Sequence, residues 1–464
     1  MVFSSITFLF AFLAAVLLLY FVCPLKGKNW LLALSGLVFY AWGEPVYIFL
    51  MLFSTLADYT AGRVIDRYRD HPGIRKAALI ASIVIELLLL GVFKYSALLI
   101  NTINGIFGLQ LFNPNLPLPV GISFYTFQSM SYVIDLYRGD TRVQKNYVYY
   151  LAYVSMFPQL VAGPIVRYKD VAAELVHRTN TASAFAAGAR RFTVGLGKKV
   201  LLANSIGALW DAELAAQSAG TLTAVGGWLG IAAFGFQIYF DFSGYSDMAI
   251  GMGQMLGFHF PENFDYPYTA ASVTEFWRRW HISLTTWFRE YLYIPLGGSR
   301  KGTWRTVRNI FLVWFCTGFW HGASWNFILW GLHFFVWLML EKYLLRDFLQ
   351  KLPSWLRHFY TLVVVFVGWG VFAMENLTVC AGYFKTCFGS GTLWSAADGY
   401  YLTAYGLTLL ILTVGSTRLP RKVWDRLPER TRDLLGPLLM AAGLVICTAY
   451  LVDGSYNPFL YFRF

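Results

Sequence analysis

Long apolar stretches separated by short polar loops recur along the whole chain. A helix needs about 20 apolar residues to cross the hydrocarbon core of a bilayer, and several of these stretches approach that length. The expected segments lie near residues 5–23, 30–42, 46–60, 77–99, 119–137, 193–210, 222–251, 309–320, 325–340, 359–372, 401–414 and 438–451. The pattern therefore predicts an all-α, polytopic membrane bundle with about 11–13 membrane segments, in one domain over residues 1–464.

The composition agrees with this pattern. Hydrophobic residues make up 57% of the chain and charged residues only 13%, whereas a soluble domain carries about 25% charged residues. The first apolar stretch lacks both a positively charged start and a cleavage site rich in small residues. We therefore expect it to be a retained span and not a removed signal peptide.

The net charge of +12 is concentrated in the loops. The basic loops lie near residues 26–28, 63–76, 138–145, 167–199, 278–308, 342–357 and 418–432. They can all lie on one side of the membrane, which the positive-inside rule makes the cytoplasmic side, and both termini are then expected outside. Their cations are expected to face anionic lipid headgroups of the bilayer, so no nucleic-acid partner is predicted.

Residues 147–166 interrupt the alternation of apolar segments and basic loops, because basic stretches flank this apolar run on both sides. Pro158, Gly163 and Pro164 would break a helix here. One interpretation is a re-entrant or broken helix that helps to build a cavity, since irregular backbone at membrane depth must be buried in protein or face water. The other is an ordinary kinked span.

Several classes of site have no support in the sequence. The cysteines show no metal-binding spacing, although Cys380 and Cys387 are close enough in sequence to pair, so no metal is expected. There is no phosphate-binding P-loop and no Gly-x-Ser-x-Gly elbow. ATP use and serine hydrolase chemistry are therefore not expected.

One long apolar segment carries acidic and hydroxyl side chains. If residues 237–247 are helical, Asp241 and Tyr245 share one face, with Ser243 on an adjacent stripe. A carboxylate in an apolar span must face the protein interior or a polar tunnel. These residues either lock helices together through hydrogen bonds or line a tunnel and contact substrate.

Two histidines stand out from their surroundings. His281 belongs to residues 274–295, whose apolar spacing predicts one amphipathic helix at the membrane interface, with Glu275 and Arg279 paired on its surface. His321 lies between two apolar runs that we expect to form a hairpin, with Gly322 and Ser324 supplying the bend. A neutral imidazole is the natural general base for a hydroxyl group, and an ionisable group at membrane depth indicates function. Either ring could instead be a satisfied structural residue.

Several motifs together resemble those of the membrane-bound O-acyltransferase (MBOAT) family. They are PVGISF at 119–124, FPQ at 157–159, GPI at 163–165, DFSGYSD at 241–247, FWRRWH at 276–281, YIPLGG at 293–298, GFWHG at 318–322 and NPFLYFRF at 457–464. The resemblance covers roughly residues 30–464 and is nearest to the bacterial alginate O-acetyltransferase branch, and the teichoic-acid D-alanyl transferase branch shares many of the motifs. It implies acyl transfer to a hydroxyl, with His321 as the catalytic residue and His281 at the second functional position.

The resemblance also implies the partners. The donor would be an acyl thioester on the cytoplasmic side, acetyl-CoA or a carrier-protein thioester, and no cofactor would be permanently bound. The final acceptor would be a cell-surface or exported polysaccharide, reached through a secreted or membrane-anchored acyltransferase on the outer side of a bacterial cell membrane. A tunnel through the bundle would join the two sides.

On this hypothesis His321 takes the hydroxyl proton, and His281 orients the thioester or donates to the oxyanion with Trp280 or Arg279 nearby. The expected tunnel lining is Trp320, Asn326, Arg279, Trp280, Asp241, Ser243 and Tyr245. The segment 309–320 is too short to cross the bilayer, which would put His321 near mid-membrane. D-alanyl transfer towards teichoic acid and a transporter or flippase with broken helices remain alternatives.

Overall fold

The computed structural model describes residues 1–161, 163–454 and 459–460, and these residues form helices and loops without a strand. The predicted all-α fold is confirmed. The chain divides into two compact units, one comprising residues 1–192 and 245–262, the other residues 193–244 and 263–464. Of the motifs named above, most of NPFLYFRF lies outside the described residues. Helices α10 (Ala182–Gly197) and α12 (Ala224–Met255) contribute to both units.

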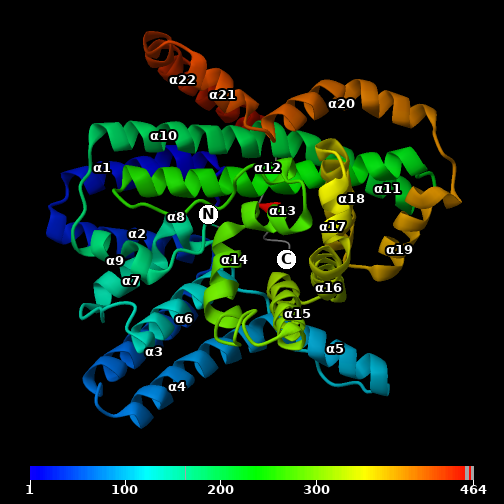
Figure 1. Ribbon diagram of the computed structural model, residues 1–464. Helices are drawn as coiled ribbons and strands as arrows, with labels where there is room; N and C mark the ends of the chain where they lie inside the picture. Colours follow the sequence, from blue (N-terminus) through cyan, green and yellow to red (C-terminus); the bar gives the residue numbers. More distant parts are fainter. Residues whose placement is uncertain (162, 455–458, 461–464) are drawn as a thin grey trace. The chain divides into compact units, whose positions relative to one another are not determined.

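The first unit is built from the N-terminal helices. They are η1 (Thr7–Leu13), α1 (Ala14–Val22), α2 (Leu25–Gly43), α3 (Ile48–Arg67), α4 (Pro72–Leu90), η2 (Gly91–Tyr95), α5 (Ser96–Phe107), α6 (Ile122–Arg138), α7 (Tyr147–Ser155), α8 (Phe157–Leu160) and α9 (Tyr168–Val176). Helices α3, α4 and α6 pack together, and α2 packs against α7 (Figure 1).

The apolar run at 147–166 is a broken helix, as the first interpretation expected. Helix α7 ends at Ser155, Met156 turns out of the helical conformation with ψ of 109°, and α8 continues for only 4 residues. The side chains from Tyr150 to Leu160 are buried, which meets the requirement for irregular backbone in an apolar surrounding.

The second unit contains the remaining helices. They are η3 (Lys198–Ala203), α11 (Asn204–Ser218), η4 (Pro267–Thr269), α13 (Val273–Arg279), α14 (Ile282–Phe288), η5 (Arg289–Tyr293), α15 (Thr303–His321), α16 (Trp325–Leu340), η6 (Glu341–Leu345), α17 (Arg346–Lys351), α18 (Ser354–Ala373), α19 (Leu377–Lys385), η7 (Thr386–Ser390), α20 (Ala396–Gly415), α21 (Leu419–Arg426) and α22 (Glu429–Asp453).

Helices α15 and α16 form the predicted hairpin around His321 and pack closely. Glycines make the close approach possible. A Cβ atom on Gly318 would lie 2.4 Å from the carbonyl oxygen of Phe327, and one on Gly331 would lie 2.4 Å from that of Trp314. Helix α18 packs on α16, and the short helix α13 lies against both (Figure 1). This arrangement fixes the C-terminal end of α15, where His321 lies.

Two expected element boundaries are wrong. Residues 274–295 do not form one amphipathic helix, because the chain breaks at His281 between α13 and α14. Helix α15 has 19 residues, where the apolar pattern gave twelve, because its first turns at Thr303–Arg308 are polar and still helical. Its length of about 28 Å comes close to the thickness of a hydrocarbon core. The segment is therefore not too short to cross the bilayer, and the reason given for placing His321 near mid-membrane is wrong.

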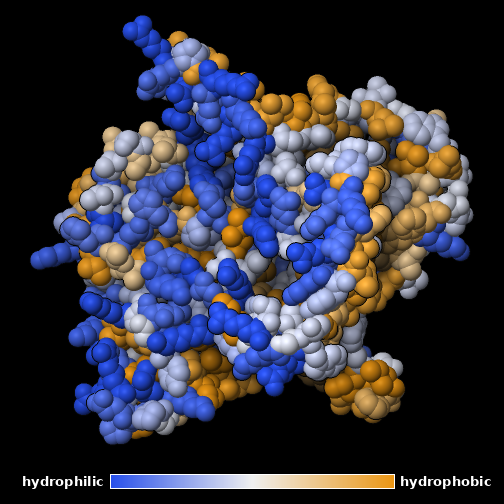
Figure 2. Space-filling view, viewed as in Figure 1, coloured by the Kyte–Doolittle hydropathy of each residue, from blue (hydrophilic) through white to orange (hydrophobic). Residues whose placement is uncertain are grey.

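Five helices in the described part of the chain are long and apolar enough to cross a membrane, and a bent pair, α20 with α21, could add a sixth. The other expected segments coincide with helices that are shorter or more polar, such as α12 with its two aspartates. Figure 2 shows hydrophobic atoms over α5 and hydrophilic atoms over α21. The protein is thus an integral membrane protein by composition and fold, and the larger segment number stays a prediction.

Candidate active site

His321 is the last residue of α15, and 4% of its surface is exposed. Its Nδ1 atom lies 2.7 Å from the carbonyl oxygen of Thr317, one turn earlier in the helix. A carbonyl only accepts, so Nδ1 must carry the proton and donate it. The ring is therefore held in the tautomer in which Nε2 has the basic lone pair, which a general base requires.

His281 occupies an unusual backbone conformation. Trp280 is extended, and His281 follows with φ of 44° and ψ of 53°, in the left-handed region. A residue with a side chain pays about 1–3 kcal/mol to stay there, and such strain concentrates at functional sites. His281 is 1% exposed, and neither ring nitrogen has a hydrogen-bond partner among the described residues. A buried imidazole left in this state is suited to binding a ligand.

The two imidazoles line the same cavity, whose volume is about 740 Å³. Their ring centroids lie 6.5 Å apart, with the ring planes at 87°. One ring comes from the end of α15 and the other from the break between α13 and α14. A reacting group between them would be within reach of both rings.

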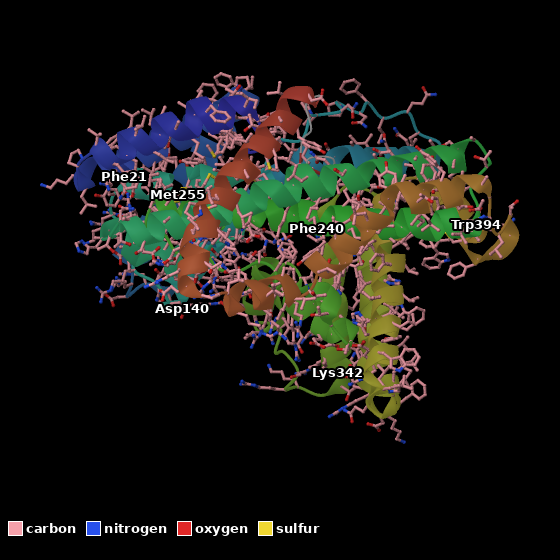
Figure 3. The ribbon with its side chains drawn as sticks, turned by 90° about the horizontal axis from the view of Figure 1, so that it is seen from above. Phe21, Asp140, Phe240, Met255, Lys342 and Trp394 are labelled. Carbon is pink, nitrogen blue, oxygen red and sulfur yellow. The ribbon has the colours of Figure 1, made fainter. Side chains whose placement is uncertain are left out.

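The cavity lining combines apolar and cationic side chains. The apolar and aromatic part includes Trp277, Leu284, Trp314 and Phe288. The cationic part is formed by Arg278, Arg289, Lys342, Arg346 and Arg357, and the first four of these are exposed and therefore mark the mouth of the cavity. In Figure 3, Lys342 lies at the end of the α15–α18 group remote from Phe240 on α12. The cavity can therefore hold an apolar segment ending in an anion.

Burial lowers the pKa of His281 well below its ordinary value, and the nearby His321 lowers it further. His281 is thus neutral at neutral pH, with one N–H donor and one acceptor. Its N–H can donate a hydrogen bond to a developing negative charge.

Two tryptophans expected in the lining pack behind it. Trp280 does not line the cavity; it packs on Trp369 at 4.7 Å and on Phe276 at 5.6 Å between ring centroids. Trp320 is buried, with its ring centroid 5.1 Å from that of His321 and 6.1 Å from that of His281. Both tryptophans therefore support the histidines from outside the cavity.

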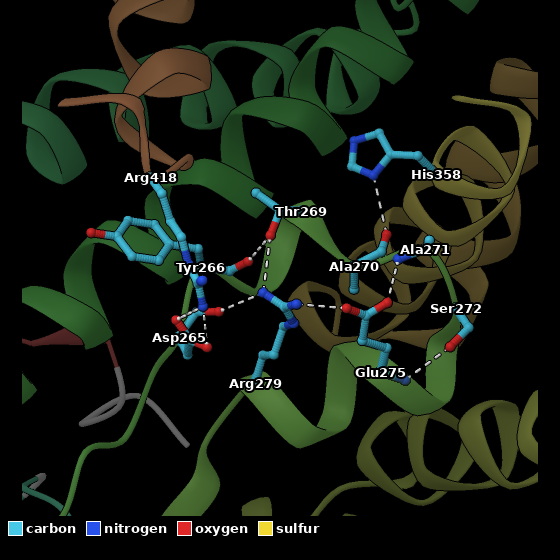
Figure 4. A network of polar contacts seen from close by, with 10 residues as sticks. All are labelled: Asp265, Tyr266, Thr269, Ala270, Ala271, Ser272, Glu275, Arg279, His358 and Arg418. Carbon is cyan, nitrogen blue, oxygen red and sulfur yellow. Dashed lines mark hydrogen bonds and ion pairs between the residues drawn. The ribbon is translucent and has the colours of Figure 1, made fainter. Parts of the chain in front are cut away.

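Arg279 also lies outside the cavity lining, in a network of polar contacts (Figure 4). Its guanidinium pairs with Glu275 at 2.6 Å, as the helical spacing predicted. It also donates to the hydroxyl of Thr269 at 3.2 Å and to the carbonyl oxygen of Asp265 at 3.4 Å. Arg418 binds both carboxylate oxygens of Asp265. Arg279 thus ties α13 to the preceding loop.

The polar residues of α12 are not in the cavity lining either. Asp241 forms an ion pair with Lys199 at 2.5 Å and accepts the backbone N–H of Leu460 at 2.8 Å. Ser243 is buried, and in the first unit the ring of Tyr245 stacks on Phe3 at 4.3 Å. These contacts match the helix-locking interpretation of Asp241.

Asn326 holds the hairpin against α18. It is buried, and its amide donates to the carbonyl oxygen of Phe372 at 3.0 Å and to that of Val371 at 3.4 Å. It does not line the cavity. The five cysteines are free, so Cys380 and Cys387 are not bonded in the structure.

The cations of the mouth were missed as site residues by the sequence analysis. Arg289, Lys342 and Arg346 belong to stretches that were expected to be loops and are helical in the structure, and their charge indicated only which side of the membrane they face. The spacing between residues 289 and 342 gives no sign that they share a cavity. The density of arginines on both sides of the His321 hairpin is the one signal that could have indicated it.

Comparison with known proteins gives consistent matches. A family model described as the membrane-bound O-acyltransferase family, MBOAT, matches residues 141–382. The chain is 44% identical to the probable alginate O-acetylase AlgI of Pseudomonas aeruginosa, over 86% of this chain and 76% of that protein. It is 34% identical to the peptidoglycan O-acetyltransferase of Helicobacter pylori, over 81% and 78%. It is 28% identical to the teichoic acid D-alanyltransferase of Bacillus subtilis, over 46% and 56%.

Proposed function

Because the chain belongs to the membrane-bound O-acyltransferase family, we propose that it passes an acetyl group from a cytoplasmic thioester across the membrane for O-acetylation of a cell-surface or exported polysaccharide. The observation that carries this proposal is the pair of buried imidazoles in one cavity, with ring centroids 6.5 Å apart. One ring can accept the proton of the attacking hydroxyl while the other donates a hydrogen bond to the developing oxyanion.

His321 acts as the general base in this mechanism. Its Nε2 accepts the proton of the attacking hydroxyl while the oxygen bonds to the thioester carbonyl carbon. The hydrogen bond from Nδ1 to Thr317 supports this role, because it fixes the tautomer. The tetrahedral intermediate then collapses, the carbon–sulfur bond breaks, and Nε2 returns the proton to the leaving thiolate.

His281 stabilises the negative charge that develops on the carbonyl oxygen. The ring is neutral, buried and without a hydrogen-bond partner in the described part of the chain, so its N–H can donate a hydrogen bond to the oxyanion. Removing one such donor typically costs a factor of about 10²–10³ in kcat. The low exposure of the site strengthens this interaction, since little water competes with it.

The donor enters at the cationic mouth. Acetyl-CoA and an acylated phosphopantetheine arm on a carrier protein are both anionic thioesters, and Arg289, Lys342 and Arg346 provide complementary charge. The cations that line the cavity belong to the basic stretches 278–308 and 342–357, which supports a cytoplasmic position for the mouth in the inner membrane of a bacterium. The attacking hydroxyl belongs to the outer acyltransferase partner, which carries the acetyl group as an ester until a hydroxyl of the polymer displaces it.

The 28% match to a teichoic acid D-alanyltransferase keeps one second candidate open. In that case the donor would be a carrier-protein thioester and the transferred group D-alanine. The match covers 46% of this chain, against 86% for the alginate O-acetylase. Acetyl transfer is therefore the better-supported proposal.

The test is the ester-linked acetate on exported glycans in a strain whose own gene has been deleted and replaced by variants. His321→Ala should give no acetylation at a membrane protein level equal to that of the unchanged protein. His259→Ala is a matched control, because this histidine is exposed and pairs with Glu174 outside the second unit. Normal acetylation with His321→Ala would refute the proposal, and D-alanine esters in place of acetate would support the second candidate.

A further inference from the structure

Helix α14 begins at Ile282, and His281, the residue before it, provides no cap from its side chain. The residue before a helix usually carries a short side chain whose oxygen accepts one of the first backbone N–H groups. At His281 that position holds the imidazole that faces the cavity, and neither of its nitrogens is used in this way. The first N–H groups of α14 must therefore find their acceptors elsewhere.

Asn263, from the loop that follows α12, supplies these acceptors. Its carbonyl oxygen accepts the N–H of Ile282 at 3.0 Å. Its side-chain Oδ1 accepts the N–H of Ser283 at 3.3 Å and the hydroxyl of Ser283 at 2.9 Å. Asn263 is 1% exposed and does not line the cavity. Asn263 thus caps α14 in place of the residue at the N-cap position, His281.

The same loop also holds the other side of the break. The N–H of Asp265 donates to the carbonyl oxygen of Arg279, the last residue of α13, at 3.0 Å. The loop from Asn263 to Asp265 therefore bonds to the chain on both sides of Trp280 and His281. A backbone held at both ends can keep the left-handed conformation of His281 that an isolated segment would relax.

We propose that Asn263 is a positioning residue for acyl transfer, which caps α14 from outside and so keeps the imidazole of His281 directed at the reacting group. This inference rests on the proposed function, because it acts through His281. Without the Asn263 side chain, the N–H and hydroxyl of Ser283 lose an acceptor. In this proposal a ring nitrogen of His281, the N-cap residue, then turns to accept them, and this rotation removes the ring from the cavity.

Three single variants test the capping. Asn263→Ala should lower kcat by about 10- to 100-fold, because small displacements of a catalytic group cost this much, while the KM for the thioester donor stays unchanged. Asn263→Asp keeps the acceptor oxygen and should restore most of the rate. Ser283→Ala removes only the hydroxyl donor and should give a smaller loss than Asn263→Ala. Equal losses of kcat with Asn263→Ala and Asn263→Asp, in protein that folds, would overturn the proposal.

A double-mutant cycle separates positioning from a general structural role. In a His281→Ala background there is no ring left to position, so Asn263→Ala should cost almost nothing further in kcat. Asn309→Ala is the matched control. Asn309 is also a buried asparagine, and it bonds to the carbonyl oxygens of Leu296 and Gly298 near the start of α15. Its effect should be the same with and without His281.

The outcomes distinguish the two proposals. Undiminished transfer by His281→Ala would contradict the role of His281 itself. A large loss with His281→Ala together with an unchanged kcat for Asn263→Ala would overturn only the positioning role. Additive losses in the cycle would also overturn it, because they would mean that Asn263 acts on something other than His281.

Discussion

The imidazole rings of His281 and His321 meet nearly at right angles, at 87°, with their centroids 6.5 Å apart. Forty positions separate them in the sequence, and neither the end of α15 nor the break between α13 and α14 could by itself set the distance between the rings. Their distance depends on the packing of α13 against α16 and α18 and on the tight α15–α16 hairpin. Any change that shifts one pair of helices should therefore reduce transfer without touching either ring.

The stability of the protein should depend on pH through His281. Burial, and after it the neighbouring His321, lower the pKa of His281 in the folded state. In the unfolded chain the ring takes up a proton as the pH falls through about 6.5, and the folded state does not. The unfolded state then binds more protons than the folded state. The contribution of His281 to the free energy of unfolding is therefore fully present above about pH 7 and decreases as the pH falls below 6.5.

Thermal unfolding in detergent between pH 5 and 7.5 measures this effect. His281→Gln should reduce the acid-induced fall in Tm, because the unfolded state no longer gains that proton. His71→Gln, which removes an exposed imidazole of the first unit, serves as the control and should leave the fall as it is. An identical acid dependence for His281→Gln and the unchanged protein would argue against a neutral buried ring.

Reversing a charge at the cavity mouth should weaken donor binding without affecting the chemical step. Lys342 is exposed and lines the cavity. Lys342→Glu should raise the KM for acetyl-CoA by roughly 3- to 10-fold with little change in kcat, and the effect should shrink at high salt. Lys422→Glu on α21, also exposed but outside the lining, should behave like the unchanged protein. A fall in kcat alone with Lys342→Glu would contradict a role in donor binding.

The hairpin around His321 could be predicted because its signals are local. Gly322 and Ser324 interrupt two apolar runs, and the structure ends α15 at His321 and begins α16 at Trp325. The break in the helix near Pro158 could be predicted for the same reason. A proline or glycine acts on its own neighbours, and its effect does not depend on the rest of the fold.

The break at His281 could not be predicted, because its cause is distant in the sequence. The apolar spacing of residues 274–295 fits one helix, whereas the contacts from Asn263 hold the chain in the interrupted conformation. The pairing of Glu275 with Arg279 was predicted correctly, since both lie on one helix face. The remaining bonds of Arg279, to Thr269 and Asp265, come from a loop whose path no local pattern indicates.

Replacement of Arg279 should act through stability. The guanidinium holds Glu275, Thr269 and the carbonyl oxygen of Asp265 together (Figure 4). Arg279→Ala leaves Glu275 without its cationic partner, so Tm should fall, and activity per folded molecule should fall only slightly. Arg279→Lys should recover part of the Tm, because it keeps the charge but not the fork of donors. If Arg279 instead contacted the thioester, Arg279→Ala would lower kcat at an unchanged Tm.

The ion pair of Asp241 with Lys199 distinguishes an enzyme from a transporter. The side chains are 2% and 4% exposed, and removing one partner of a buried pair typically costs about 3–5 kcal/mol. Asp241→Asn should therefore lower Tm strongly, while the protein that remains folded should still transfer acetyl groups. The double variant Asp241→Leu with Lys199→Met removes both charges and should regain much of the lost stability.

His321→Ala should show the reverse pattern, with a nearly unchanged Tm and no transfer. A transporter that uses the carboxylate would lose its activity in both Asp241 variants and keep it with His321→Ala. Measuring Tm and transfer on the same purified preparations of all three variants decides between the two classes.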